Sequence, residues 1–189
     1  CFTDYQLMTL TLEEIKDYIF STVAEKHSEN FPLRVTLANA NEQARGDIQE
    51  LRDKSLLIWD FNMKSVPYMT PVSNPEGMIS CVVYYGDAEN GWVCMGYALG
   101  CVNKEGTAVE ITHVEKRCDA GADFKSKFLP IIVDAFSAYG LYLNHVQLAK
   151  VEKFAFVGPL PGVIEYYKQH GFEYVDDYLG TDAVIKFLS

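Results

Sequence analysis

Two side chains able to accept a proton, Glu110 and His113, lie close together in one strand-like segment. A carboxylate there can take a proton from an ammonium group, directly or through water, and an imidazole titrates near working pH. Regular strand alternation predicts Glu110, Thr112 and Val114 on one face and His113 on the other. Both residues also have a simpler interpretation, as a solvated or ion-paired glutamate and a packed or surface histidine.

The five cysteines form an odd set with no C-x-x-C pair and no histidine at zinc-ligand spacing. We therefore expect reduced, mostly buried thiols and no metal site, as is typical of cytoplasmic proteins. Cys118 is the exception because it lies in a turn of small residues. A nucleophilic role for Cys118 would need a histidine and an orienting acid beside it.

The composition predicts one globular domain covering residues 1–189. Of the 189 residues, 49% are hydrophobic and 22% charged, which excludes a disordered tail, a collagen-like repeat and a coiled coil. The formal net charge of -10 disfavours nucleic acid and anionic membranes as partners and favours a cationic amine or a basic segment. No apolar run reaches the length of a membrane span and no signal peptide precedes the domain, so we expect a cytoplasmic protein without a membrane partner.

The N-terminal part of the chain predicts a strand over residues 5–10 and then two helices. In a capping box, the side chain of the first residue accepts the backbone N–H of the glutamate three residues later. The glutamate side chain accepts the backbone N–H of the first residue. This pattern marks both expected helix starts, at Thr11-x-x-Glu14 and Asn39-x-x-Glu42.

An apolar, strand-like segment at residues 55–61 precedes a loop over residues 64–77. Three prolines in the loop fit neither a helix interior nor a central strand: Pro67, Pro71 and Pro75. Long loops within a domain often form binding walls, so we expect this loop to be a substrate wall.

The C-terminal part predicts a three-strand antiparallel meander, a helix, a strand, a short helix and a closing hairpin. Turn-forming Gly and Asn residues separate the meander strands at 78–85, 92–102 and 107–116. The remaining elements are a helix from Gly121 to a C-cap at Gly140, a strand at 145–151, a helix at 161–170, and strands at 172–178 and 183–188. This order predicts an α+β fold whose mixed, mostly antiparallel central sheet is flanked by helices.

Two segments resemble the GCN5-related N-acetyltransferase (GNAT) superfamily. Residues 165–173, EYYKQHGFE, resemble its helix-ending pattern of aromatic, Tyr, polar residues, Gly and Phe, and residues 6–15, QLMTLTLEEI, resemble the usual opening of such domains. With the element order, the resemblance covers nearly the whole chain. It implies a GNAT-like fold and an N-acyltransferase that moves an acetyl group from acetyl-CoA, as cosubstrate and without a metal, to a primary amine.

The resemblance also implies roles for individual residues. Tyr167 takes the position that protonates the departing CoA thiolate in many relatives, and Glu110 becomes the general base, with His113 as the second candidate. Backbone N–H groups of the strand at Val114 would polarise the thioester carbonyl. The simpler alternative is that Tyr166 and Tyr167 only pack the short helix onto the sheet.

A strand-to-helix turn that presents backbone N–H groups suits the pyrophosphate of CoA. The turn at residues 116–127 is rich in small residues and basic, and the family's Gln/Arg-x-x-Gly-x-Gly/Ala signature fits it incompletely in two registers. One register uses Arg117, Ala120 and Ala122, and the other uses Cys118, Gly121 and Asp123. The cofactor-binding residues implied by the resemblance are Val114, Arg117, Cys118, Ala120, Gly121 and Ala122.

Two further departures from the family leave alternative functions open. Pro130 interrupts a helix that starts at Ala122, so we expect a kink or a restart with Ser126 as N-cap. Leu160 stands where many relatives have an asparagine that contacts the cofactor. These departures favour a non-catalytic GNAT-fold binding or regulatory protein with a degenerate CoA site, and a third option is a different acyl or aminoacyl donor.

The acceptor is the least defined part of the expected reaction. The acidic chain favours a cationic acceptor, either a small molecule such as a polyamine or aminoglycoside-like amine, or the lysine side chain of a protein. The sequence leaves the oligomeric state open, with a homodimer as one option.

Overall fold

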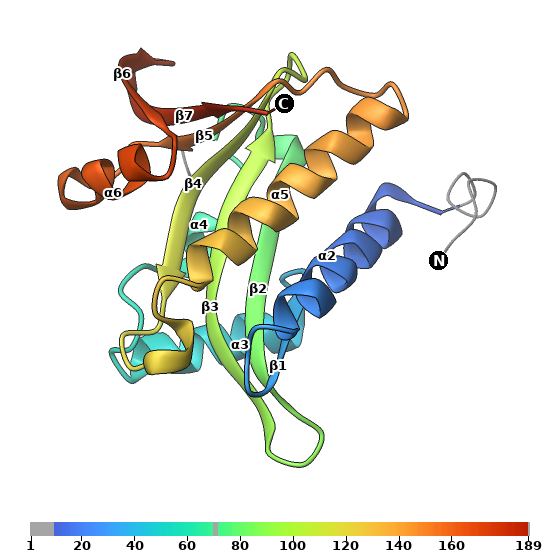
Figure 1. The fold of residues 1–189 in the computed structure, drawn as a ribbon, viewed down its shortest axis with the longest axis vertical. Coiled ribbons are helices and arrows are strands. Elements are labelled where there is room, and N and C mark those ends of the chain that lie inside the picture. The colour runs from blue at the N-terminus through green and yellow to red at the C-terminus, as the bar shows by residue number, and fades with distance from the viewer. Residues whose placement is uncertain (1–9, 70–71, 189) are drawn as a thin grey trace.

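The computed structural model describes residues 10–69 and 72–188. Seven strands form one sheet in the order β1-β2-β3-β4-β5-β7-β6 (Figure 1). The strands are β1 (Arg34–Ala38), β2 (Met78–Asp87), β3 (Gly91–Val102), β4 (Ala108–Lys116), β5 (Lys153–Val157), β6 (Glu173–Tyr178) and β7 (Thr181–Phe187). All neighbours pair antiparallel except β4 and β5, which are parallel, so the prediction of a mixed, mostly antiparallel sheet flanked by helices is confirmed.

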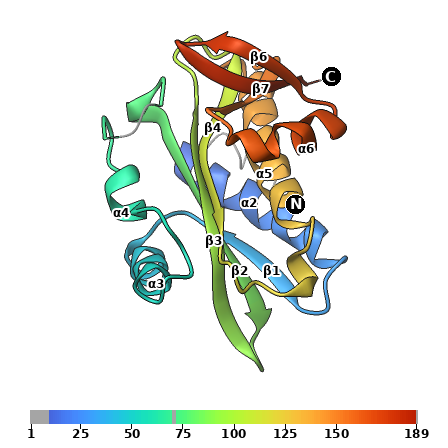
Figure 2. The same cartoon turned by 90° about the vertical axis from the view of Figure 1, so that its left-hand side faces the viewer.

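Helices cover both faces of this sheet (Figure 2). The α-helices are α2 (Leu12–Ser28), α3 (Glu42–Asp53), α4 (Phe61–Lys64), α5 (Phe128–His145) and α6 (Ile164–Gln169), and short 3-10 helices are η1 (Pro75–Gly77), η2 (Ala122–Phe124) and η3 (Pro161–Val163). Helices α2 and α5 pack on one face of the sheet and form the larger apolar core with it. Helices α3 and α4 pack on the opposite face and form a second core. None of the helices in the described ranges is both long and apolar enough to cross a bilayer.

The first predicted helix start is confirmed and the second is wrong. At Thr11 both bonds of the capping box form, and α2 begins at the next residue. The cap of α3 is Asn41, whose side chain accepts the N–H of Ala44 at 2.8 Å, whereas Asn39 donates to Asp17. Asn39 is displaced from the cap because β1, a short strand that the sequence analysis did not predict, ends immediately before it.

Two predicted strands are wrong, and most of the predicted strand at 5–10 lies outside the described residues. Residues 55–60 form a turn and a loop. The Leu56 N–H donates to the Leu51 carbonyl at 2.9 Å, and the Asp60 side chain caps α4. The segment 145–151 is also irregular, and the strand there begins later, at Lys153. The loop at 64–77 is interrupted by η1.

Helix α5 begins later than predicted and does not end at Gly140. Its N-cap is Lys127 rather than Ser126, whose φ of 61° is incompatible with the extended conformation of a capping residue. Pro130 is therefore the third helical residue, where an N–H has no helical partner in any case.

Gly140 is required for packing rather than for helix termination. A Cβ at this position would lie 2.6 Å from Cγ2 of Val109 on β4. We expect Gly140→Ala to lower the free energy of unfolding by about 1–3 kcal/mol through overpacking. The matched control is Gly46→Ala in α3, where a Cβ meets nothing within 4 Å and should raise stability by up to about 1 kcal/mol. Urea unfolding of both variants checks the prediction, and stabilisation by both would contradict it.

The cysteines lie mostly in the core, as predicted. Cys81, Cys94 and Cys101 are buried free thiols and Cys118 is exposed, while Cys1 lies outside the described residues.

Candidate active site

An irregularity in β4 separates this strand from β5 and determines where the site lies. Gly100 is opposite Ile111 and Leu99 is opposite His113, so Thr112 has no register partner on β3, although its hydroxyl donates to the Leu99 carbonyl at 3.3 Å. The pairing with β5 ends at Ile111 and Phe156. Such a bulge bends and twists the strand, and from Thr112 onward β4 has no register partner on β5.

The bulge also overturns the predicted alternation of side chains. Glu110, Thr112 and His113 all line one cleft, whereas Val114 lines the two smaller cavities beyond it. The extra residue shifts the alternation of side chains between the two faces of the sheet by one position. His113 therefore lies on the same face as Glu110.

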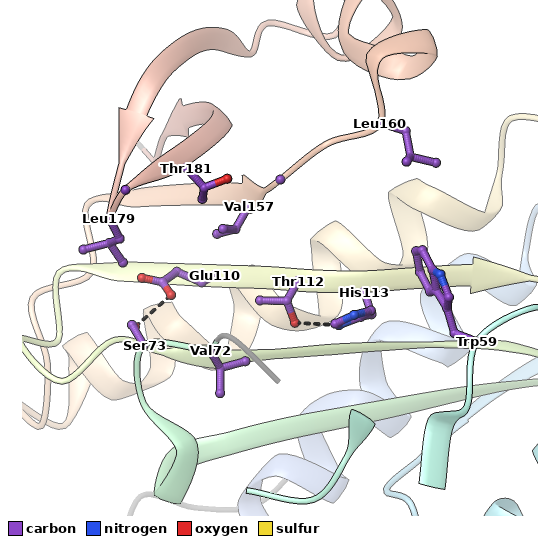
Figure 3. Close-up of a pocket in the computed structure, with 12 residues that line it drawn as sticks. Trp59, Val72, Ser73, Glu110, Thr112, His113, Val157, Leu160, Leu179 and Thr181 are labelled. Carbon is purple, nitrogen blue, oxygen red and sulfur yellow. Dashed lines mark hydrogen bonds between the residues drawn. The ribbon is translucent and has the colours of Figure 1, made fainter. Parts of the chain in front are cut away.

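The cleft has a volume of about 810 Å³ and lies over the β4 bulge. Its walls come from the α3–α4 connection, the predicted wall loop, β4, the segment after β5 and the β6–β7 turn (Figure 3). They are formed by Trp59, Val72, Ser73, Glu110, Thr112, His113, Val157, Gly158, Leu160, Leu179, Gly180 and Thr181. Val72 and Ser73 are the contribution of the 64–77 loop, while residues 70–71 of this loop lie outside the described ranges.

Glu110 is held at one end of the cleft by two hydroxyl groups. Its side chain is almost fully buried, with 1% of the residue exposed. The Ser73 hydroxyl donates to Oε2 at 2.8 Å, and the Tyr178 hydroxyl donates to Oε1 at 2.9 Å. Burial and the neighbouring Glu110 carboxylate raise the pKa of Tyr178, so this phenol stays protonated as a donor. The three residues come from three different parts of the chain and meet only in the folded structure.

Cys101 belongs to the same buried group. Its thiol lies 3.7 Å from Oε2 of Glu110, and burial together with this carboxylate raises the pKa of the thiol to about 11. The protonated thiol is a further weak donor to Glu110.

His113 lies between the cleft and the smaller cavity that continues from it. Its Nδ1 atom is 3.1 Å from the Thr112 hydroxyl, and the Trp59 ring meets the imidazole edge-on with centroids 5.0 Å apart. Burial, with a smaller effect from Lys64, lowers the pKa of His113 from 6.5 to about 4. The imidazole is therefore neutral at pH 7.

The depressed pKa of His113 predicts a pH-dependent stability. The unfolded chain binds a proton near pH 6.5 that the folded chain takes up only near pH 4, so stability falls as pH drops from about 6.5 to about 4. Above this window the residue contributes no pH dependence. We expect a His113→Gln variant to lose less unfolding free energy than wild type between pH 7 and pH 4.5 in urea titrations. An NMR midpoint of 6.5 for the His113 ring would contradict the assignment.

Tyr167 lies at the narrow passage between β4 and the segment that follows β5. Its ring stacks on Phe156 with centroids 4.6 Å apart, and burial raises the pKa of its hydroxyl to about 12. Tyr167 borders a small cavity of about 130 Å³, which shares Thr112 and His113 with the cleft. The Tyr167 hydroxyl has no hydrogen bond to another described residue.

A groove of about 320 Å³ continues from Tyr167 to the N-terminus of α5. It is lined by Val114, Lys116, Phe124, Ser126, Phe128, Leu129, Val163, Tyr166 and Tyr167. No side chain caps α5, and the N–H groups of Phe128 and Leu129 donate to no other described residue. The Lys116 ammonium group likewise has no ion pair or hydrogen bond to a described residue, so the groove combines one unpaired cation with the positive end of an 18-residue helix.

Only part of the predicted cofactor-binding set reaches this groove. Val114 lines it, whereas Arg117 forms a two-bond ion pair with Asp119 at 2.6 and 3.0 Å and borders a separate cavity beside α3. The other four residues do not line the groove, because Cys118, Ala120 and Gly121 lie in the connection to η2 and Ala122 is the first residue of η2. The Cys118 N–H is already bonded to the Leu56 carbonyl at 3.1 Å.

The sequence analysis missed Ser73, Tyr178 and Trp59 as site residues. Ser73 lies between Pro71 and Pro75 of the predicted wall loop, which is the only signal that pointed toward it. Tyr178 reaches Glu110 across 68 positions of the chain, and no local pattern encodes that contact.

No protein-family model matches the chain, and no curated protein sequence matches it either. Among solved structures, the chain resembles a domain from Methanocaldococcus jannaschii with a TM-score of 0.51 and 9% identity, over 82% of this chain and 99% of that one. It also resembles aminoglycoside N-acetyltransferase AAC(6')-Ib11 with a TM-score of 0.50 and 17% identity, over 81% of this chain and 96% of that one. The chain has the fold of the GCN5-related N-acetyltransferases.

Proposed function

We propose that this protein is an N-acyltransferase that moves an acetyl group from acetyl-CoA to a primary amine by direct attack. The observation that carries the proposal is a row of three adjoining cavities where β4 and β5 separate, each of which shares lining residues with the next. The first is the cleft that contains the buried Glu110 carboxylate, the last is the groove at the uncapped N-terminus of α5, and Tyr167 lines both the middle cavity and the groove.

The groove at α5 fits the anionic part of acetyl-CoA. Unbonded N–H groups at the positive end of a helix are suited to phosphate oxygens, and Lys116 adds a formal charge. Pro130 has no N–H to contribute, which leaves Phe128 and Leu129 as the donors of the first turn. The proposed phosphate site therefore consists of Lys116 and the N–H groups of Phe128 and Leu129. It does not use the Arg117 motif that the family resemblance implied.

The backbone of β4 beyond the bulge is suited to the thioester carbonyl. The three residues from Thr112 to Val114 have no register partner on β5. All three border the small cavity next to Tyr167. Backbone N–H groups aimed at an oxygen that gains negative charge are worth several kcal/mol in the transition state, roughly 3–4 for a single donor.

The side chains account for the protons of the reaction. Glu110 accepts one proton from the ammonium group, through water or through the Ser73 hydroxyl that already bonds it. The amine nitrogen then forms a bond to the carbonyl carbon and the carbon–sulfur bond breaks. Tyr167 gives its proton to sulfur and recovers one from the nitrogen as the neutral amide forms. The buried phenol keeps this proton at neutral pH because its pKa is raised.

The non-catalytic alternative loses one of its three arguments, which were the incomplete signature, Pro130 and Leu160. Pro130 does not break α5 because it stands in the first helical turn. The likeness to an aminoglycoside N-acetyltransferase is consistent with an amine acceptor but leaves its identity open.

Release of the CoA thiol tests the proposal. Acetyl-CoA is incubated with the protein and a mixture of primary amines, free thiol is measured, and mass spectrometry detects the acetylated amine. We expect amine-dependent thiol release with a matching acetamide product. Thiol release without an acetylated amine, or none at all, would contradict an N-acyltransferase.

A further inference from the structure

The cleft described above carries a charged side chain only at one end. Among the described residues that form it, Glu110 is the only carboxylate. Trp59, Val72, Val157, Leu160 and Leu179 provide the apolar part of the wall. Figure 3 shows Glu110 beside Leu179 at one end and Trp59 with Leu160 at the other.

Much of this apolar wall is accessible. Leu179 is 70% exposed and Leu160 is 62% exposed, and both border the cleft. The remaining polar side chains of the wall are neutral, because Ser73, Thr112 and Thr181 carry hydroxyl groups and His113 is deprotonated at pH 7. The cleft therefore offers one negative charge and a large uncharged surface.

We infer that the acceptor is a primary alkylamine with a single positive charge, whose alkyl or aryl body lies against the wall formed by Val72, Leu160 and Leu179. This inference rests on the proposed function and specifies its substrate. The Glu110 carboxylate pairs with one ammonium group. The alkyl or aryl body packs on the apolar wall and shields it from water. A second ammonium on the same body would lose its hydration without a partner. The overall acidity of the chain pointed to a cationic acceptor, with polyamines among the candidates, but the cleft itself does not match a polycation.

Matched pairs of linear amines test this inference, because they differ only in the terminal group. Each pair is a monoamine and the α,ω-diamine of equal length, from three to eight carbons, such as hexylamine and 1,6-diaminohexane. We expect affinity and kcat/KM of the monoamines to rise with length, by about fourfold for each methylene that is buried. The longer diamines should be weaker than their partners by about tenfold or more. Equal or better performance of the diamines would overturn the inference.

Binding is measured separately from catalysis, so that failure of the proposed function is distinguishable. Trp59 lines the cleft and Trp92 lies at the start of β3, so a Trp92→Phe protein reports amine binding through Trp59 fluorescence. Monoamine-selective binding without acetyl transfer supports the cleft chemistry and contradicts the proposed reaction. Transfer with diamine preference contradicts the inference alone.

One variant should reverse the preference. Leu179 has a φ of 54°, a conformation that aspartate tolerates better than leucine, so Leu179→Asp adds a second carboxylate to the wall without backbone strain. We expect the diamine-to-monoamine ratio to rise about tenfold at the chain length that spans the two carboxylates. The control is Leu148→Asp, since Leu148 is also exposed but lies away from the cleft. An unchanged ratio in Leu179→Asp, or an equal change in the control, would overturn the inference.

A capped lysine distinguishes two sources of the same alkylamine. Nα-acetyl-lysine amide has the monoamine chain but ends in two amide groups. If it matches hexylamine, protein lysines belong to the substrate class, and if it is weaker, the class is restricted to free alkylamines. A capped lysine and spermidine that both exceed all monoamines would contradict the apolar wall as the binding surface.

Discussion

Replacing Tyr167 with phenylalanine is expected to lower kcat for acetyl transfer about 100-fold or more, because positioned proton donors contribute 10²–10⁴-fold. The substitution removes only the hydroxyl, so the ring still stacks on Phe156. The hydroxyl has no hydrogen bond to another described residue, and its loss should cost little stability. Steady-state kinetics and calorimetric titration with acetyl-CoA measure the two effects, and the dissociation constant should stay within about twofold of wild type.

Tyr166→Phe is the matched control for this prediction. Tyr166 also borders the α5 groove and meets Tyr167 edge-on with ring centroids 5.8 Å apart, but it does not line the small cavity next to β4. We expect Tyr166→Phe to keep kcat within about threefold of wild type. Equal losses in both variants would assign the tyrosine pair to packing and remove Tyr167 as the proton donor.

Glu110→Gln is expected to lower kcat by about 100-fold, because glutamine cannot take a proton from the ammonium group. With the base removed, the reaction depends on amine that is already deprotonated in solution. The rate of the variant should therefore rise about tenfold per pH unit up to the pKa of an alkylamine, near 10.4, while the wild-type rate levels off at lower pH. A pH profile of kcat with saturating acetyl-CoA measures this difference.

Ser73→Ala separates proton transfer from positioning. It removes one hydrogen bond to the same carboxylate but leaves the base and the Tyr178 bond in place. We expect a loss below about tenfold in kcat and an unfolding free energy lower by about 1 kcal/mol. If Glu110→Gln raised KM with kcat and the pH profile unchanged, Glu110 would bind the ammonium group without acting as base.

The meander, the closing hairpin and the first helix could be predicted because their signals are local. The capping box at Thr11 formed as predicted, and Asn90-Gly91 indicated the β2–β3 turn, where Gly91 has a φ of 79°. The strand predicted at 55–61 failed because its backbone N–H groups have partners outside any strand. Leu56 donates to the Leu51 carbonyl, and Ile58 and Trp59 donate to the Glu115 carboxylate.

The candidate site was predictable only in part, because tertiary pairing creates it. Glu110 and Tyr167 were proposed from residue type and family resemblance, and the structure places them in two adjoining cavities that share Thr112. The bulge at Thr112 depends on the register of β3 against β4, which no window of the sequence contains. Arg117 was expected near phosphate, but it pairs with Asp119, donates to the Cys94 carbonyl and borders a cavity lined by residues of α3.

Calorimetric titration of acetyl-CoA into wild type, Lys116→Glu and Lys104→Glu tests the central claim most directly. Lys116 lines the groove at α5, whereas Lys104 makes the same charge change in the β3–β4 turn, away from it. We predict saturable binding to wild type, binding weakened about 10- to 100-fold in Lys116→Glu, and unchanged binding in Lys104→Glu. Absence of binding to wild type at millimolar acetyl-CoA, or equal affinity in all three proteins, would contradict a cofactor site between β4 and α5.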